Sequence, residues 1–247
     1  MVFRLPAGPP SGAPPDRPIL SNPPDRDGRI ETTRSRRQTL TAVSIPNTYR
    51  RLRYGKPIVV VSGLPRSGTS MAMKMLQAGG LPLVLDGERK ADEDNPKGYF
   101  EYEPVMNLAR DPDRSWLAGA RGKGVKIIST LLRELPADYN YRVVFMRRDL
   151  REILASQAKM LERREEVPEI ADERMMEVFE NDLWRAGYLL KNGPQFCVLP
   201  VHYTEVLAQP LEQARRLAGF LDGDLDVEKM AAVADPELYR NRAESRA

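Results

Sequence analysis

The chain is poor in the residues that build metal centres and disulfide bonds. Its 247 residues include 1 cysteine, Cys197, and 1 histidine, His202. A single cysteine excludes a disulfide within the chain and a metal site made of several cysteines. Most zinc sites also need cysteine or histidine ligands. We therefore expect no metal in the function of this protein.

Long apolar runs are absent as well, and none approaches the roughly 20 residues that a membrane-spanning helix needs. The N-terminus has no apolar region of the kind that directs secretion, so we expect a cytoplasmic protein. Charged residues make up 30% of the sequence and apolar residues 41%. The formal charge of +3 suits a small anionic ligand as well as nucleic acid, and it does not choose between them.

The first 50 residues differ in composition from the rest. Residues 1–43 are rich in proline, glycine, arginine and serine and have little apolar surface to offset the entropy of ordering. We predict a disordered N-terminal segment over residues 1–50 and one folded domain over residues 51–247.

Short apolar strands alternate with helical segments in the predicted domain. The expected strands are residues 58–61, 81–85, 124–129, 141–146 and 196–201. The expected helices are residues 69–76, 105–117 in part, 150–164, 172–190, 210–221 and 226–234. This alternation predicts an α/β fold with three layers, in which helices flank a mostly parallel sheet. Ligands of such sheets bind beyond the carboxyl ends of the strands.

The segment GLPRSGTS, residues 63–70, connects the first strand to the first helix of this domain. Its backbone N–H groups and the positive end of the helix dipole are suited to one phosphate. The spacing of Gly63 and Gly68 is that of a P-loop, but Thr69 stands where an NTPase carries lysine. Arg66 supplies a positive charge within the loop instead, and it can bind an anion through two nitrogens.

A second candidate phosphate site follows the strand at residues 141–146. Arg148 comes at the end of this strand, and Ser156 lies eight residues later, about two turns into the next helix. A guanidinium and a hydroxyl in these places can hold one phosphate together. The alternative is a surface arginine with an incidental helical serine.

The two motifs together, PRSGTS and FMRRDLREILASQAKML, resemble the sulfotransferases that use 3′-phosphoadenosine 5′-phosphosulfate (PAPS). The similarity spans residues 58–242, and ASQAKML and NPKGYFE resemble a bacterial subgroup. It implies that the loop binds the 5′-phosphosulfate, that the strand-end arginine and the helical serine bind the 3′-phosphate, and that Lys126 approaches the sulfonyl group. The cosubstrate residues implied in this way are Pro65, Arg66, Ser67, Gly68, Thr69, Ser70, Arg148, Ser156, Tyr203, Arg240 and Arg242.

The catalytic base is where the sequence departs from the family. Cytosolic eukaryotic members place a histidine two residues after the strand lysine, whereas Ile128 and Ser129 fill that region here. Other members use a glutamate shortly after the P-loop helix, so Glu88 and Asp86 are the first candidates for a base. Glu101 is the third candidate.

The sequence therefore predicts transfer of a sulfonyl group from PAPS to a hydroxyl or amine, with Arg66 and Lys126 stabilising the charge that grows on the leaving phosphate. The implied partner is a small-molecule or carbohydrate acceptor and not a nucleic acid. One alternative is an ATP-dependent small-molecule kinase on a P-loop scaffold, which would need a Mg²⁺-binding acid at a strand end. Asp149 is near a strand end, but it follows two arginines, which is an odd setting for a Mg²⁺ ligand. A second alternative is a nucleotide-binding protein without catalysis.

Overall fold

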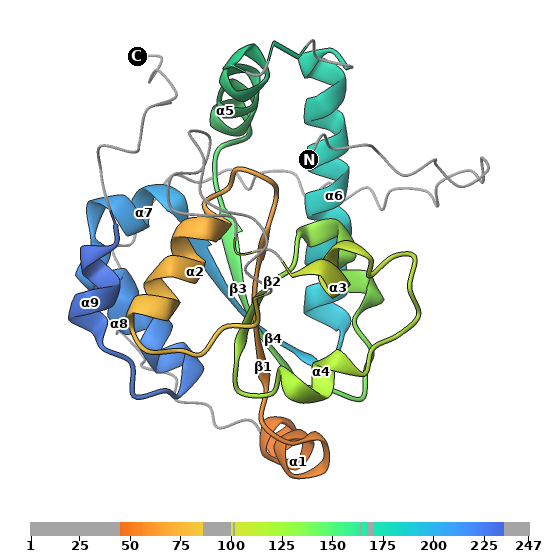
Figure 1. The fold of residues 1–247 in the computed structure, drawn as a ribbon, viewed down its shortest axis with the longest axis vertical. Coiled ribbons are helices and arrows are strands. Elements are labelled where there is room, and N and C mark those ends of the chain that lie inside the picture. The colour runs from red at the N-terminus through yellow and green to blue at the C-terminus, as the bar shows by residue number, and fades with distance from the viewer. Residues whose placement is uncertain (1–44, 86–99, 101, 164, 167–169, 235–247) are drawn as a thin grey trace, which may run out of the picture. The chain divides into compact units, whose positions relative to one another are not determined.

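The computed structural model describes residues 45–85, 100, 102–163, 165–166 and 170–234. Its sheet has 4 strands in the order β2-β1-β3-β4, and all neighbouring strands are parallel. The strands are β1 (Ile58–Gly63), β2 (Gly124–Lys126), β3 (Tyr141–Arg147) and β4 (Phe196–His202). Helices flank this sheet, which confirms the expected α/β class (Figure 1). Of the segment expected to be disordered, residues 1–50, residues 1–44 lie outside the described residues and residues 45–50 belong to a helix.

Two apolar clusters divide the helices between the two faces of the sheet. Alternate side chains of β1 point to opposite faces: Val59 and Val61 belong to one cluster, Ile58 and Val60 to the other. The first face is covered by α2 (Thr69–Ala78), α7 (Tyr203–Ala208), α8 (Pro210–Leu221) and α9 (Val227–Ala232). The second face is covered by α3 (Glu103–Met106), α4 (Trp116–Gly119), the 3-10 helix η1 (Ser129–Glu134) and α6 (Asp172–Asn192). Both faces of the sheet are therefore shielded from solvent, which explains why every residue of β1 is buried.

Helix α5 (Leu150–Arg163) follows β3 and reaches beyond the carboxyl ends of the strands (Figure 1). A third apolar cluster joins it to α6 and to the loop after β1. This cluster contains Leu64, Ile153, Leu154, Met175 and Phe179. The loop with the P-loop spacing is thus packed against two helices that come much later in the chain.

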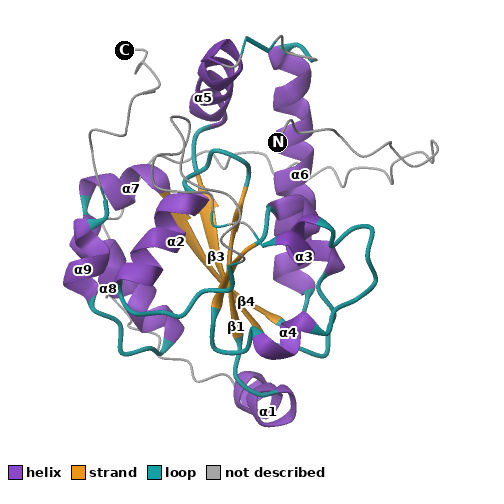
Figure 2. Cartoon of the chain, viewed as in Figure 1, coloured by secondary structure: helices purple, strands orange, loops and turns teal. Residues whose placement is uncertain are grey.

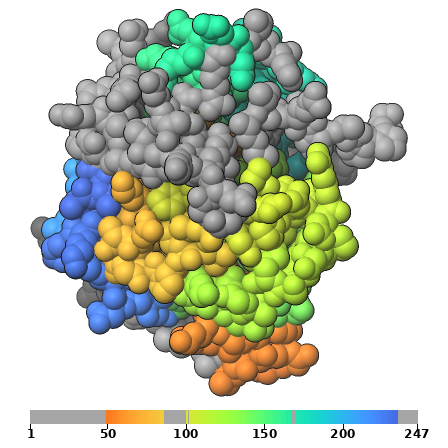
Figure 3. All heavy atoms as spheres, viewed as in Figure 1, coloured from red at the N-terminus to blue at the C-terminus, as the bar shows by residue number. Residues whose placement is uncertain are grey.

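Helix α1 (Ile45–Tyr54) lies at the other end of the sheet, where the strands begin, and it is at the bottom of the view in Figure 3. The Arg50 guanidinium binds the Asn140 side chain at 3.1 Å and the carbonyls of Ala137 and Tyr139 at 2.6 and 3.0 Å. These bonds fix α1 beside the start of β3. The helix crosses residue 50, where we placed the boundary of the folded domain.

Several expected elements are shorter in the structure. The strand expected at residues 124–129 ends at Lys126, and η1 begins at Ser129. The strand expected at residues 81–85 is reduced to one bridge between Leu83 and Gly124. The segment expected to be partly helical over residues 105–117 forms α3 and α4 with a loop between them (Figure 2). Pro112 lies in this loop and cannot donate a helical hydrogen bond.

The short helix α7 was not expected, because its Tyr203 follows a strand directly. None of the helices among the described residues is long and apolar enough to cross a membrane.

Candidate functional site

The loop after β1 has a backbone that only a few residue types accept readily. Gly63 and Gly68 have φ values of 146° and 99°, and Arg66 between them has φ 64°. A Cβ on Gly63 would lie 2.7 Å from the Met146 carbonyl oxygen and 2.6 Å from Ser67 Oγ. Residue 63 must therefore be glycine for β1 and β3 to approach at this point. Alternating right- and left-handed residues turn successive N–H groups toward one point, which suits an anion.

Helix α2 begins directly after this loop, with Gly68 as its N-cap and no side chain capping it. The first N–H groups of a helix have no partner within the helix, and they lie at the positive end of the helix dipole, which attracts an anion. Thr69 is buried and Ser70 half-buried in this first turn. Ser67, also buried, donates its hydroxyl to the Leu64 carbonyl at 2.7 Å. Its side chain thus shapes the loop from within, beside the half-buried Pro65.

Arg66 connects the loop to helix α5. Its Nε donates to Ser156 Oγ at 2.6 Å, and its Nη1 lies 3.5 Å from the Met160 sulfur. The sequence analysis placed Arg66 at the first phosphate and Ser156 at the second. The structure brings the two side chains into contact.

Arg148 lies in the same cluster and is nearly buried, with 7% of its side chain exposed. Its Nε pairs with the Glu152 carboxylate at 3.0 Å, and its Nη1 donates to the Arg66 carbonyl at 3.2 Å. Its guanidinium carbon stands 4.4 Å from the centre of the Tyr203 ring. Four predicted cosubstrate residues, Arg66, Arg148, Ser156 and Tyr203, therefore meet at the carboxyl edge of the sheet.

Glu152 belongs to this cluster and was missed by the sequence analysis. Its side chain is 4% exposed, and it comes four residues after Arg148. That i,i+4 spacing is the signal that could have found it. A buried carboxylate beside a buried guanidinium fixes the orientation of the guanidinium and halves the positive charge that Arg66 and Arg148 bring together.

Lys126 ends β2 and is half-buried, and it pairs in register with Val61 of the central strand. It is thus at the same edge of the sheet as the loop. Of the other predicted site residues, five lie outside the described residues: Asp86, Glu88, Glu101, Arg240 and Arg242.

Asp149, the possible Mg²⁺ ligand of a kinase, has another role in the structure. Its Oδ1 accepts the backbone N–H of Arg151 at 2.8 Å at the start of α5. Within the described ranges, no three acidic, cysteine or histidine side chains gather as a metal site would require.

A hydroxyl–carboxylate pair occupies the region where the sulfotransferase resemblance leads one to look for histidine. Ser129 is buried and donates its hydroxyl to Oδ2 of Asp182 on α6. Burial raises the pKa of the Asp182 carboxyl, while the Ser129 hydrogen bond and the charges of Arg185 and Arg133 lower it in part.

The sequence analysis did not single out Asp182. The buried residues of α6 are Met175, Phe179, Ala186 and Leu190, and position 182 falls on the same face of the helix. An acidic residue on the apolar face of a predicted helix is the sequence signal that could have identified Asp182.

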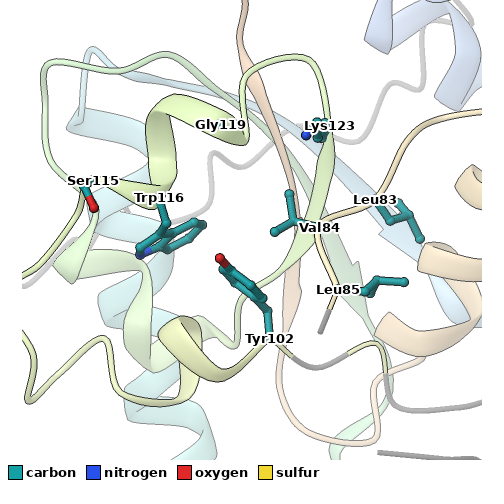
Figure 4. Close-up of a pocket in the computed structure, with 8 residues that line it drawn as sticks. All are labelled: Leu83, Val84, Leu85, Tyr102, Ser115, Trp116, Gly119 and Lys123. Carbon is teal, nitrogen blue, oxygen red and sulfur yellow. The ribbon is translucent and has the colours of Figure 1, made fainter. Parts of the chain in front are cut away.

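A separate hollow of about 480 Å³ lies at the β2 edge of the sheet (Figure 4). Its aromatic walls are Tyr102 and Trp116, whose rings meet edge to face at 5.3 Å. The buried Trp116 Nε1 has no hydrogen-bond partner among the described residues. The complete lining is Leu83, Val84, Leu85, Tyr102, Ser115, Trp116, Gly119 and Lys123.

No protein-family model matches the chain, and no curated protein matches its sequence. Sulfotransferases are among the solved structures that resemble it. The mouse sulfotransferase SULT7A1 complexed with PAP is 16% identical, with a TM-score of 0.42 over 72% of this chain and 62% of that one. The sulfotransferase domain from the curacin biosynthetic pathway is 15% identical, with a TM-score of 0.45 over 75% and 87%.

A sugar kinase from Janibacter sp. HTCC2649 also resembles the chain, at 18% identity and a TM-score of 0.32 over 73% of this chain and 99% of that one. The chain thus spans less than two thirds of the mouse sulfotransferase, and all three TM-scores are below 0.5. We therefore argue the function from the site itself.

Proposed function

We propose that this protein is a sulfotransferase that transfers a sulfonyl group from PAPS to a hydroxyl or amine of a small-molecule or carbohydrate acceptor. The observation that carries this proposal is the contact between Arg66 of the P-loop-like turn and Ser156 of α5, with Arg148 bound to the Arg66 carbonyl. The loop proposed to bind one phosphate is therefore in contact with the side chains proposed to bind the second.

The 5′ end of PAPS is assigned to the loop and to α2. PAPS carries an activated sulfonyl group joined through oxygen to its 5′-phosphate. The N–H groups at the start of α2, which lie at the positive end of the helix dipole, hold that phosphate. Lys126, at the same edge of the sheet, adds a positive charge where the leaving oxygen gains negative charge.

The 3′-phosphate is assigned to Arg66, Arg148 and Ser156. Arg66 is thereby moved from the leaving phosphate, where the sequence analysis placed it, because its Nε binds Ser156. Because Glu152 and the Arg66 carbonyl take the Nε and Nη1 groups of Arg148, the guanidinium is already oriented before a ligand arrives. A preoriented cation loses less entropy on binding than a mobile one. The two guanidiniums and one carboxylate leave a net positive charge for a phosphate.

The test is calorimetry with 3′,5′-ADP and with 5′-AMP, which differ only in the 3′-phosphate. We expect 3′,5′-ADP to bind much more tightly. Arg148→Ala should weaken 3′,5′-ADP binding by about 2–5 kcal/mol, the usual cost of losing one buried charged contact, and leave 5′-AMP nearly unchanged. Arg147→Ala, which removes the exposed neighbouring arginine, is the matched control and should bind both nucleotides as the wild type does.

Equal binding of the two nucleotides, or no binding of either, would refute the PAPS assignment. Because Arg148→Ala also removes a partner of Glu152, urea unfolding must show that the variant is folded. Arg148→Lys, which keeps the charge, should fall between wild type and Arg148→Ala. Mg²⁺-dependent turnover of ATP would support the kinase alternative instead.

A further inference from the structure

We propose that Asp182, oriented by Ser129, is the general base that takes the proton from the acceptor. This inference rests on the proposed sulfonyl transfer and adds to it the group that the sequence analysis sought at Glu88 and Asp86.

The position of Ser129 follows from the pairing of β1 and β2. The Ile127 N–H donates to the Val61 carbonyl at 3.0 Å, so the two chains stay paired up to this residue. Ser129 begins η1 two residues later. Because the strands are parallel, it is placed beyond their carboxyl ends, where ligands of such sheets bind.

The position of Asp182 follows from the packing of α6. Phe179 of this helix shares an apolar cluster with Leu64 of the phosphate loop, and Asp182 comes three residues after Phe179, on a neighbouring part of the same face. Leu183 packs against this cluster and also against the core that contains β1 and β2. The Asp182 carboxylate therefore lies against η1, on the helix that also packs against the phosphate loop.

The two carboxylate oxygens of Asp182 have different surroundings. Oδ2 accepts the hydroxyl of the buried Ser129. Within the part of the chain that the structure describes, Oδ1 has no hydrogen-bond donor, and the side chain is half-buried. Oδ1 is therefore the atom that can accept a proton from a bound hydroxyl.

The step balances with this single base. The acceptor oxygen forms a bond to sulfur, and its proton passes to Asp182 Oδ1. The bond from sulfur to the bridging oxygen breaks, and its electron pair stays on the 5′-phosphate. A carboxyl with a pKa raised by burial is a better base than an ordinary aspartate, and Arg185 on α6 and Arg133 on η1 limit that rise.

The experiment uses the full chain with water in place of the acceptor, and it measures PAP released from PAPS. We expect Asp182→Asn to slow this release by about 10²–10⁴-fold, the usual contribution of a general base, and to leave 3′,5′-ADP binding unchanged. Glu180→Gln, which neutralises an exposed carboxylate on the same helix, is the matched control and should match the wild type in both assays.

The pH dependence separates catalysis from a purely structural contact between η1 and α6. The base acts when ionised, so the wild-type rate should fall on the acid side, at a pH above the usual aspartate value of about 3.9. Ser129→Ala removes a hydrogen bond that lowers the Asp182 pKa, so the acid limb should move to higher pH, and Ser129→Thr should restore it. Carbon-13 NMR of the Asp182 carboxyl should show the same shift without any substrate.

The outcomes distinguish this inference from the proposed function. Failure of the wild type to bind 3′,5′-ADP would overturn the proposed function and this inference with it. Normal 3′,5′-ADP binding with an Asp182→Asn rate equal to the wild type, or with no release of PAP above the spontaneous rate, would overturn only the role of Asp182. An acid limb that Ser129→Ala leaves in place would overturn the role of Ser129.

Discussion

Gly68 is the residue at which the loop, helix α2 and the arginine cluster depend on one another. Its φ of 99° is in the left-handed region. A Cβ at this position would lie 2.6 Å from Cδ2 and 3.2 Å from Cε2 of Tyr203, and 3.3 Å from the Met146 methyl carbon. Gly68→Ala therefore strains the backbone and drives a methyl group into a buried ring.

The two costs can be given separate magnitudes. An L-residue in the left-handed region costs about 1–2 kcal/mol. Forcing an extra carbon into a packed site costs about 1–3 kcal/mol more. Tyr203 is a buried residue at the start of α7, so its ring cannot swing into solvent without loss of packing. We expect Gly68→Ala to lower the free energy of unfolding by about 2–5 kcal/mol.

Gly80 offers a control for the backbone cost alone. Its φ is 95°, and a Cβ there would meet nothing within 4 Å. Gly80→Ala should therefore lower the free energy of unfolding by about 1–2 kcal/mol only. Urea unfolding of the two variants measures the difference, which is the cost of the contact with Tyr203.

Gly68→Ala should also weaken nucleotide binding. The Arg148 guanidinium lies 4.4 Å from the Tyr203 ring centre, so a displaced ring disturbs the proposed 3′-phosphate site. Calorimetry should show weaker 3′,5′-ADP binding for Gly68→Ala and unchanged binding for Gly80→Ala. Equal destabilisation in the two variants, or normal 3′,5′-ADP binding by Gly68→Ala, would refute the packing of Tyr203 between Gly68 and Arg148.

Two further predictions concern stability. Gly187 is exposed within α6, and a Cβ there would meet nothing within 4 Å. Gly187→Ala should therefore raise the free energy of unfolding, measured in urea, by about 0.5–1 kcal/mol. A lower free energy of unfolding would contradict a regular helix at this position. Burial raises the pKa of Asp182 in the folded protein. The contribution of Asp182 to the free energy of unfolding is therefore fully present below its unfolded pKa of about 3.9, and it is lost as the pH rises through the folded pKa. The stability of the wild type relative to Asp182→Asn should therefore fall over this pH range, and a constant difference would refute the raised pKa.

The elements that the sequence predicted best are those whose signal is local. The β-branched run at the start of β1 and the apolar run of β3 mark buried strands, and α8 begins at a proline and has the bounds expected from the sequence. The run at residues 81–85 gave the same kind of signal. It pairs with β2 through one bridge only, which depends on tertiary geometry and not on the run itself.

The candidate site was also predicted from local patterns only in part. Loop spacing and the eight-residue step from Arg148 to Ser156 are visible in the sequence, and both belong to the observed cluster. Glu152 and Asp182 are charged residues in helices, where solvent exposure is the usual outcome. Their burial depends on which elements pack against them, and no local pattern reports the direct contact of Arg66 with Ser156.

The direction of Arg66 gives a physical reason for a loop without the NTPase lysine. In an NTPase, a lysine at the position of residue 69 reaches the β- and γ-phosphates, but the side chain here is a buried threonine in the first turn of α2. The positive charge comes instead from the α5 side, where Arg66 reaches Ser156 and Arg148 holds the Arg66 carbonyl. Charge placed beside the loop suits a ligand whose second phosphate branches from the ribose better than one whose phosphates follow in a row. This asymmetry, and not the loop spacing, is what favours 3′,5′-ADP over ATP as the nucleotide to test first.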